Sequence, residues 1–454
     1  MGERADVVVI GMGPGGEEVA GRLAEAGLDV VGVDRGLVGG ECPYWACIPS
    51  KMMIRAADLL AEARRVPGMA GRADVEPDWA PVARRIRDEA TDGWDDRAAV
   101  ERFEGRGGRF VRATGRVVGP GRVTVGETEL EVGRAIVVAT GSSPSIPPVP
   151  GLAASPYWTN REAIQATAAP ASMIVLGGGA IGVELGQAFA RFGTRVTVVE
   201  SADRLLPPEE PEAGELLAHV LRAEDIDIVL GVQAEGVAHS HDGFAVTLSS
   251  GEVLQAERLL LAAGRHADPA GAGLASVGVP GDAGFAPVDG NLRVAPGVWA
   301  LGDLTGKGAF THISMYQARI VIADVLGRPH EEADYRAVPR VTFTDPEVGS
   351  VGQSEEQARS AGLDVRVGRA DVAASTRGWI HKSGNQGLVK LVTDRRAGVL
   401  VGATFVGPTG GEVLGLLTLA VHARVPVSRL REMIYAYPTF HRAVEDALRD
   451  LDLT

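Results

Sequence analysis

The feature that most constrains the fold of this 454-residue chain is a strand, glycine loop, helix and strand unit that occurs twice. In the first copy, an apolar run leads into the loop 11–16, and the strand after the helix ends in Asp34. In the second copy the loop is 177–182, and the closing strand ends in Glu200. Loop and acid are 23 positions apart in both copies, so two accidental glycine-rich turns are a poor explanation.

Each loop has the glycines that a dinucleotide-binding turn needs. The first glycine allows the tight turn, the second lets the backbone approach a pyrophosphate, the third lets the helix pack on the strand, and the acid binds a ribose hydroxyl. These positions are Gly11, Gly13, Gly16 and Asp34 in the first copy, and Gly177, Gly179, Gly182 and Glu200 in the second. Two sites imply two dinucleotides, and a flavin with a nicotinamide is the economical pair because a hydride needs an acceptor.

Both cysteines of the chain lie five positions apart, at Cys42 and Cys47. Residues five apart in a regular helix are about 7.5 Å apart along its axis, which is too far for a disulfide, so a closing pair requires distorted backbone. Pro49 is suited to open a helix over 50–65, whose N-terminus, with Lys51, would lower a thiolate pKa. The alternatives are two small buried residues or a metal pair. Zinc is disfavoured because no second ligand pair is near, so no metal site is predicted.

The formal charge of −14, from 45 basic and 59 acidic residues, argues against nonspecific nucleic-acid binding. The early apolar run 7–10 is too short for a signal peptide or membrane span. We therefore expect a cytoplasmic protein with neither a nucleic-acid nor a membrane partner. In that reducing compartment a close cysteine pair favours catalysis over a structural bridge. The length predicts two to four domains.

Further motifs follow other expected elements. The patterns predict helices over 81–103, 212–223, 355–361 and 411–422, and strands within 109–132 and over 135–139, 258–262, 298–301, 340–344, 365–369, 387–392 and 399–406. Gly141 and Gly264 each lie just beyond a predicted strand. Gly302 and Asp303 follow another, and an Asp at the carboxyl end of a strand lies where α/β sheets bind ligands, the alternative being an ordinary loop Asp. From about residue 336 the pattern is α+β without a nucleotide loop, which is suited to dimerisation.

Taken together, these motifs resemble those of the flavoprotein disulfide reductases, which include dihydrolipoamide dehydrogenase, glutathione reductase and mercuric reductase. The most specific part of the resemblance is Cys-x4-Cys followed by Pro49-Ser50-Lys51. It implies an α/β fold with two Rossmann-like domains, the second inserted in the first, and a C-terminal α+β dimerisation domain. The implied boundaries are 1–150 and 273–335 for the FAD domain, 151–272 for the NAD(P)H domain and 336–454 for the interface domain.

The resemblance also implies roles for individual residues. Gly11, Gly13, Gly16, Asp34, Gly141, Gly302 and Asp303 would bind FAD, and Gly177, Gly179, Gly182 and Glu200 would bind the nicotinamide cofactor. Gly264 is a further candidate cofactor-binding residue. Cys47 would face the flavin, Cys42 would attack the substrate, and Lys51 would pair with Glu184. The enzyme would be an obligate homodimer with an active site shared between subunits. The carboxylate of Glu200 favours NADH over NADPH, although Arg204 is close in sequence.

The sequence departs from the family pattern at the proton shuttle. The family places a His before Pro-Thr, whereas this chain has Tyr437, and Arg442 stands at the position of the usual Glu. A Tyr with a pKa near 10 is a poor base at neutral pH but can donate a proton. His441 and Glu445 share one face of an expected helix and could form a displaced dyad, or His441 could be a surface residue. Tyr44, Trp45 and Tyr437 suit a flat acceptor such as a quinone, although packing is the commoner role for such residues.

We therefore expect an FAD-dependent NAD(P)H oxidoreductase that passes electrons through a redox-active Cys42–Cys47 disulfide to a thiol, disulfide or other small-molecule acceptor. One alternative is direct flavin chemistry with non-essential cysteines, as in a quinone reductase, a transhydrogenase or a biosynthetic dehydrogenase. The other is a lipoamide-dehydrogenase-like subunit that acts mainly as a bound component of a larger complex.

Overall fold

The computed structural model describes residues 3–453. The chain divides into two compact units, each built from three stretches of sequence. Unit one comprises the described residues up to Ser50, Arg84–Ser145 and Gly264–Asp334. Unit two comprises Lys51–Ala83, Ile146–Ala263 and the described residues from Tyr335 onward. Two helices cross the boundary between the units, α3 (Cys47–Arg65) and α4 (Ala80–Arg85).

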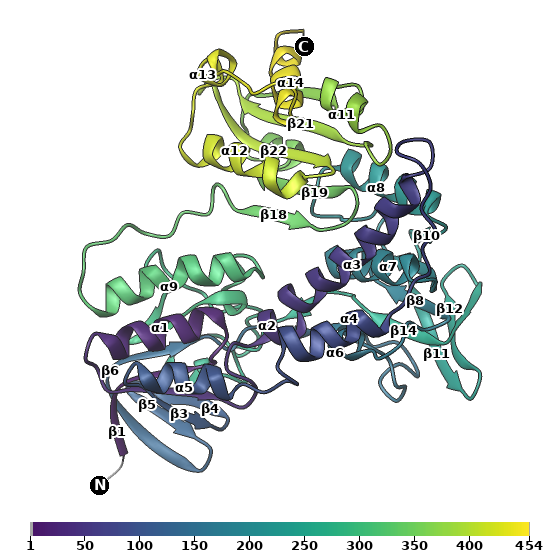
Figure 1. Ribbon diagram of the computed structural model, residues 1–454. Coiled ribbons are helices and arrows are strands. Elements are labelled where there is room, and N and C mark those ends of the chain that lie inside the picture. The colour runs from purple at the N-terminus through teal and green to yellow at the C-terminus, as the bar shows by residue number, and fades with distance from the viewer. Residues whose placement is uncertain (1–2, 454) are drawn as a thin grey trace. The chain divides into compact units, whose positions relative to one another are not determined.

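Unit one is a sheet with helices on one face and a β-meander on the other (Figure 1). The order of its main strands is β16-β17-β6-β1-β2-β3, and β4 and β5 form a hairpin that continues onto β6. Its elements are β1 (Glu3–Ile10), α1 (Pro14–Glu25), β2 (Val30–Asp34), α2 (Glu41–Trp45), the π-helix η1 (Ile86–Ala90), α5 (Arg97–Gly105), β3 (Arg109–Arg112), β4 (Gly115–Gly119), β5 (Arg122–Val125), β6 (Thr128–Val138), β7 (Ser143–Pro144), β15 (Arg265–His266), η2 (Leu274–Val277), β16 (Arg293–Ala295), β17 (Val298–Ala300), η3 (Gly302–Thr305) and α9 (Thr311–Val325).

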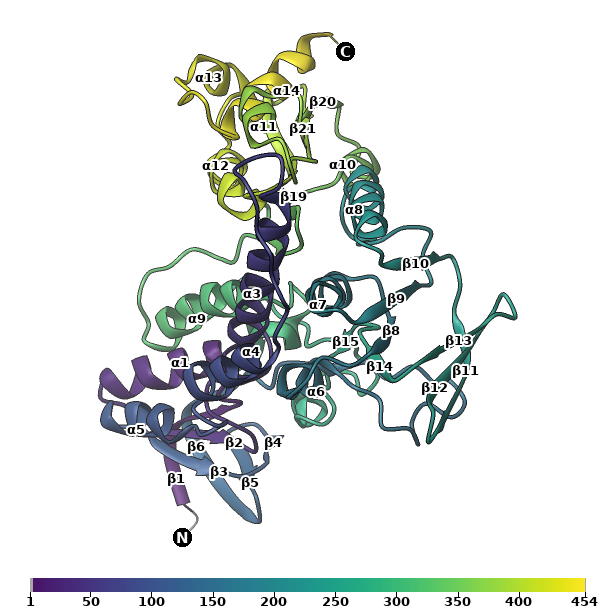
Figure 2. The same cartoon turned by 45° about the vertical axis from the view of Figure 1, so that its right-hand side comes forward.

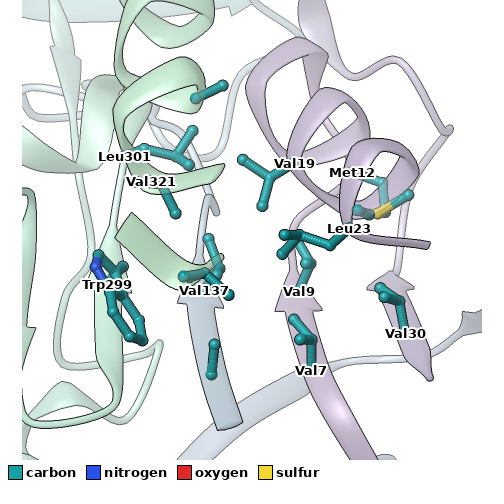
Figure 3. Close-up of a cluster of buried hydrophobic side chains, with 14 of the residues drawn as sticks. Val7, Val9, Met12, Val19, Leu23, Val30, Val137, Trp299, Leu301 and Val321 are labelled. Atoms are coloured by element: carbon teal, nitrogen blue, oxygen red, sulfur yellow. The ribbon is translucent and has the colours of Figure 1, made fainter. Parts of the chain in front are cut away.

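Strand β1 is apolar at consecutive positions because both faces of the sheet are covered. Val7 and Val9 point toward helices α1 and α9 and join the cluster drawn in Figure 3. Val8 and Ile10 point the other way and pack with the meander β4–β6. Successive side chains of a strand alternate between faces, so an unbroken apolar run is the pattern of a strand buried on both sides. The loop 11–16 is thereby fixed at the carboxyl end of a rigid strand.

Unit two contains a second parallel sheet, a small antiparallel sheet and a five-stranded antiparallel sheet (Figure 2). Their strand orders are β10-β9-β8-β14, β11-β12-β13 and β18-β19-β22-β21-β20. The elements are α6 (Asn160–Gln165), β8 (Ser172–Leu176), α7 (Ala180–Arg191), β9 (Arg195–Glu200), α8 (Pro211–Ala223), β10 (Asp227–Leu230), β11 (Ala234–Ser240), β12 (Gly243–Leu248), β13 (Val253–Ala256), β14 (Arg258–Leu261), β18 (Pro339–Thr342), β19 (Glu347–Gly352), α10 (Glu355–Ser360), β20 (Val365–Asp371), α11 (Thr376–His381), β21 (Leu388–Asp394), β22 (Val399–Gly407), α12 (Gly410–His422), α13 (Val427–Glu432) and α14 (His441–Leu453).

Three differences from the sequence expectation concern elements that were predicted or lie next to a predicted one. The helix predicted over 50–65 begins earlier, at Cys47, with Pro49 in its first turn, where no backbone donor is needed. The helix predicted over 81–103 is interrupted, because Asp92, Gly93 and Trp94 all have positive φ. Strand β19 was not predicted, yet it lies between β18 and β22. In the part of the chain from residue 3 to 453, no helix is long and apolar enough to cross a bilayer.

Candidate active site

The first glycine loop, in unit one, has the shape of a phosphate cradle. Gly11 has a φ of +96°, and a Cβ there would lie 2.3 Å from the carbonyl oxygen of Ala139. A Cβ on Gly16 would lie 1.9 Å from the oxygen of Gly11, so helix α1 rests directly on the turn. A Cβ on Gly13, by contrast, meets no atom of the described residues within 4 Å. The backbone at Gly13 is therefore open to a ligand at the N-terminus of α1, which favours phosphate.

The second loop, in unit two, repeats this geometry. Gly177 has a φ of +115°, and its Cβ would lie 2.3 Å from the oxygen of Ala262. A Cβ on Gly182 would lie 2.0 Å from the oxygen of Gly177. At Gly179 the surroundings are again open among the described residues. Both loops therefore fit a dinucleotide pyrophosphate, at the N-termini of α1 and α7 respectively.

The two strand-end acids are held in the same way in each unit. Asp34 accepts from the backbone N–H groups of Met12 and Gly36, both at 2.7 Å. Glu200 accepts from Gly178 N at 2.7 Å and from Ala202 N at 2.8 Å. These bonds fix each carboxylate beside its loop, and a carboxylate has further lone pairs for a ribose hydroxyl.

Three short motifs from distant parts of the sequence meet in unit one. The Ser142 hydroxyl donates to Asp303 Oδ2 at 2.5 Å. Arg265 donates through Nε to the Ser142 hydroxyl at 2.8 Å and through Nη2 to the Ser142 carbonyl at 2.7 Å. The glycines beside these residues, Gly141, Gly264 and Gly302, have φ values of +70°, +101° and +74°, which only glycine adopts readily. The relay therefore fixes the carboxylate of Asp303 at the end of strand β17.

The cysteine pair straddles a break between two helices. Cys42 lies in α2, and Ala46, with φ −138° and ψ −100°, separates α2 from α3. Cys47 is the first residue of α3. Both cysteines are partly exposed. This break is the irregular backbone that a disulfide five residues apart requires.

Cys47 also lies at the start of a second helix. Its Sγ is 3.5 Å from the hydroxyl of Thr311, which is the first residue of the 15-residue helix α9. Cys47 thus lies at one helix N-terminus and its sulfur beside another, and the positive end of a helix favours a thiolate over a thiol. Among residues 3–453, no group of three or more His, Cys, Asp or Glu side chains could hold a metal ion. A thiol at such helix ends is in the kind of setting where cysteines are more readily ionised.

In unit two, Lys51 and Glu184 form an ion pair on helices α3 and α7. Lys51 Nζ lies 2.7 Å from Glu184 Oε2, and the Glu184 side chain is only 7% exposed. Glu184 Oε1 accepts from the N–H of Phe343 at 2.8 Å. The ammonium group also lies 4.6 Å from the centroid of the Phe343 ring. The carboxylate and the ring together fix the ammonium in one position.

A second charged cluster, also in unit two, is centred on Arg191, which is 3% exposed. Its guanidinium contacts Asp58 at 2.6 Å, Glu224 at 2.7 and 2.9 Å, and Asp345 at 2.8 Å. Arg65 contacts the same carboxylate oxygen of Asp345 at 2.6 Å. Arg191 therefore ties helix α3, the end of α8 and the segment before β19 to helix α7, which begins at the second glycine loop.

Replacing Asp58 with Asn is expected to remove one component of the pH dependence of stability. Burial raises the pKa of Asp58 from 3.8 to about 6, against the opposing effect of Arg191. The folded state thus binds this proton more tightly than the unfolded state does. The stabilisation of the fold by protonated Asp58 is therefore complete below about pH 4 and is lost as pH rises through about 6. The side chain is 34% exposed, so solvent reduces the effect. We expect the free energy of unfolding of D58N, relative to that of wild type, to rise by about 1 kcal/mol between pH 4.5 and pH 7.

Urea unfolding at the two pH values measures this difference. Glu62→Gln, on the same helix and with a side chain 57% exposed, is the control and should follow wild type. Parallel pH profiles for wild type and D58N would contradict the assignment of this proton to Asp58.

The predicted proton-shuttle residues lie in the C-terminal part of unit two. Tyr437 is 66% exposed, and the Arg442 guanidinium lies 5.7 Å from its ring centroid. His441 is the first residue of α14 and is partly exposed. Glu445 forms ion pairs with Arg442, at 2.9 Å, and with Arg449. In the described chain no hydrogen bond joins His441 to Glu445, so a His–Glu dyad is not formed within one subunit.

Some residues of this site were not predicted from the sequence. Thr311 lies 264 positions from the cysteine it contacts. Gln317 is fully buried, accepts from Gly302 N at 2.6 Å and donates to Thr305 at 3.0 Å. Trp94 stacks on Trp45 with ring centroids 5.6 Å apart. None of them belongs to a motif, and only the helical pattern over 311–325 could have placed Thr311 at a helix start.

Comparison with known proteins agrees with this geometry. Residues 5–318 match the family model "Pyridine nucleotide-disulphide oxidoreductase", and residues 338–448 match the dimerisation domain of the same family. A dihydrolipoyl dehydrogenase of Chlorobaculum tepidum is 35% identical, with 98% of this chain and 96% of that protein covered. A mercuric reductase of Acidithiobacillus ferrooxidans is 31% identical over 96% of this chain and 81% of its own.

A solved structure with a similar fold is the Cu(II) complex of RclA from Escherichia coli, an HOCl-induced flavoprotein disulfide reductase. It superposes with a TM-score of 0.86 at 27% identity, with 99% of each chain covered. The predicted fold class, flavin- and pyridine-nucleotide-dependent enzyme class and dimerisation domain are confirmed by these matches. The chain belongs to the pyridine nucleotide-disulphide oxidoreductases, the flavoprotein disulfide reductases that its motifs resemble.

Proposed function

We propose that this enzyme oxidises NADH and delivers two electrons through Cys42 and Cys47 to a small-molecule acceptor. The observation that carries the proposal is the setting of Cys47, at the N-termini of α3 and α9. FAD, when bound, supplies a carrier that takes a hydride from one partner and gives an electron pair to another. Cys47 would hold the thiolate on the flavin side, and Cys42 would attack the acceptor. As the acceptor takes the two electrons, both thiols would be oxidised to the Cys42–Cys47 disulfide, which the flavin would reduce again in the next turnover.

The two cofactors would be held by the two glycine loops. Gly11, Gly13, Gly16, Asp34, Gly141, Gly302 and Asp303 would bind FAD, and Gly177, Gly179, Gly182 and Glu200 would bind the nicotinamide cofactor. Gly264, next to Arg265 of the relay in unit one, is a further candidate cofactor-binding residue. The open backbone at Gly13 and Gly179 supports both assignments. Lys51, restrained by Glu184 at 2.7 Å, would provide a fixed positive charge for the electron-transfer step. Tyr437 would donate a proton or hydrogen bond, and His441 is the nearby candidate base.

The preference for NADH over NADPH is expected to be at least about tenfold in kcat/KM, which corresponds to about 1.4 kcal/mol. Glu200 ends strand β9 with a carboxylate that accepts from a ribose 2′-OH and repels a 2′-phosphate. Arg204, the candidate phosphate ligand that is close to Glu200 in sequence, donates to the Pro207 carbonyl at 3.1 Å and to Asp203 at 3.2 Å. Steady-state kinetics of wild type and Glu200→Gln with both cofactors measures the preference. The ratio of kcat/KM for NADH to kcat/KM for NADPH should be smaller in the variant than in wild type.

Asp34→Asn is the matched control, since Asp34 has the corresponding place in the first loop. It should weaken flavin retention and leave the NADH/NADPH ratio unchanged. A wild-type enzyme that prefers NADPH would overturn the assignment of Glu200.

We further propose the domain boundaries 1–150, 151–272, 273–335 and 336–454, with the difference that residues 264–272 pack with unit one. They are supported by the strand order of the first sheet, in which β16 and β17 join strands from the first 138 residues.

The enzyme would act as a homodimer with an active site completed by the partner subunit. Exposed apolar side chains in the last domain support this, among them Trp379 and Ile434, which are 73% and 96% exposed. We place the enzyme in the cytoplasm, where a close cysteine pair can cycle.

Anaerobic titration of the FAD-loaded dimer with NADH tests the proposal. It is followed by lipoamide, low-molecular-weight disulfides, quinones and metal ions, added in turn. We expect each subunit to take up two two-electron equivalents, one in the flavin and one in the cysteine pair. The true acceptor should then reoxidise the enzyme. Uptake of a single two-electron equivalent that reduces the flavin and leaves the cysteine pair oxidised would argue against the disulfide step.

A second candidate function is favoured by Tyr437, because a Tyr replaces the base that a dithiol substrate needs. In this version the acceptor reacts directly at the flavin and the cysteines are not essential, as in a quinone reductase, a transhydrogenase or a biosynthetic dehydrogenase. The cysteine variants discussed below distinguish the two candidates.

A further inference from the structure

Two tryptophans in unit one form a stacked pair beside the cysteines. Trp45 lies between Cys42 and Cys47 in sequence and is the last residue of α2. Its ring stacks on that of Trp94, with centroids 5.6 Å apart and planes inclined by 21°. Trp94 Nε1 also donates to the backbone oxygen of Tyr44 at 3.4 Å. The second ring thus comes from a segment about fifty positions away and is attached to the cysteine-bearing helix.

The backbone that presents Trp94 has an uncommon conformation. It follows the π-helix η1, and Asp92, Gly93 and Trp94 have consecutive φ values of +48°, +67° and +60°. Left-handed backbone is unfavourable for Asp and Trp, and both it and π-turns concentrate at functional sites. The segment is nevertheless firmly anchored. Thr91 is 1% exposed and its hydroxyl accepts from Trp94 N at 3.3 Å, while buried Asp96 accepts from Val38 N at 2.7 Å and pairs with Arg112.

Packing alone does not account for this arrangement. Trp45 and Trp94 are each only partly buried, and neither belongs to the two buried apolar clusters of unit one. A strained, anchored loop therefore holds a large aromatic ring where it keeps solvent-accessible surface. Such a surface attracts flat conjugated molecules through offset stacking.

We propose that Trp45 and Trp94 form a stacking platform that selects planar conjugated acceptors, of which a quinone is the type. This rests on the proposed function and deepens it by naming the acceptor class. The overall reaction balances as NADH, one solvent proton and quinone giving NAD+ and hydroquinone. The quinone gains two electrons and two protons, one proton arriving as part of the hydride equivalent. An aliphatic disulfide has no π face and gains nothing from the platform.

The test compares menadione, a planar naphthoquinone, with lipoamide, an aliphatic disulfide, on the full-length FAD-loaded enzyme. Equilibrium dialysis of oxidised enzyme with menadione gives a Kd that does not depend on turnover, and steady-state kinetics gives KM for both acceptors. In Trp45→Leu and Trp94→Leu we expect Kd and KM for menadione to rise about tenfold. KM for lipoamide should stay within about twofold.

Two further variants make the result specific. Trp94→Phe keeps an aromatic face and should restore menadione binding to near the wild-type value. Trp158 is a partly buried tryptophan of unit two that contacts Phe189. The variant Trp158→Leu should leave the Kd for menadione and the KM for both acceptors unchanged. The platform proposal would be overturned if both leucine variants bound menadione as wild type does. It would also be overturned if KM rose by the same factor for menadione and for lipoamide. If none of the acceptors supported NADH oxidation by the wild-type enzyme, but menadione still bound, the proposed function alone would fail.

Discussion

Replacing Cys47 with Ser is expected to lower turnover of the physiological acceptor at least about a thousandfold, as removal of a catalytic nucleophile commonly does. A serine hydroxyl is not ionised by two helix N-termini at neutral pH, so the site loses its nucleophile even though Thr311 can still hydrogen-bond to it. Oxidation of NADH with ferricyanide, a one-electron acceptor that needs no thiol, should persist. Stopped-flow and steady-state assays with both acceptors measure this separation.

Cys42→Ser is the matched variant. It removes the thiol that is expected to attack the acceptor but leaves Cys47 between α3 and α9. We expect it to lose acceptor turnover like Cys47→Ser, while keeping a long-wavelength absorbance band from a thiolate beside the oxidised flavin, which Cys47→Ser should lack. If Cys47→Ser turned over the acceptor at the wild-type rate, the disulfide would not lie on the path, and direct flavin chemistry would be the better account.

The parts of this protein that were predictable from its sequence are those governed by local rules. The two glycine loops follow from steric requirements within a few residues, and each was found between the expected strand and helix. The runs that form β1 and β8 are continuously apolar because both faces of their sheets are covered. Such a run can be recognised in the sequence without knowing which elements cover it. Strand β19 was missed because it has no such continuous apolar run. Its sequence Glu-Val-Gly-Ser-Val-Gly has only two apolar residues, and it is specified by its neighbours β18 and β22.

Contacts between distant segments were not predictable. The helix over 81–103 was expected as one piece because its apolar spacing is helical, but the left-handed residues 92–94 break it and direct Trp94 onto Trp45. Thr311 reaches Cys47 only because of how the strands of unit one are ordered. Arg191 has no sequence signal at all, since its three carboxylate partners lie at positions 58, 224 and 345.

Replacing Arg191 with Leu is expected to lower the free energy of unfolding by about 3–5 kcal/mol, the usual cost of removing one partner from a buried charge cluster. Leucine fills much of the volume but leaves Asp58, Glu224 and Asp345 facing one another without their shared cation. Protonation can relieve only part of this, so the deficit should shrink as pH falls toward 5, close to the raised pKa of Asp58 of about 6. Urea unfolding at pH 7.5 and pH 5 measures both effects.

Arg359→Leu is the control for Arg191→Leu. Arg359 pairs with Glu355 at 2.8 Å across one helical turn, but its side chain is 55% exposed, and such pairs contribute at most about 1 kcal/mol. Equal losses in the two variants would mean that the Arg191 cluster adds no more than a surface pair. A large loss confined to Arg191 would show that helix α7, and the second glycine loop at its start, depends on a charge cluster distant in sequence from any cofactor motif.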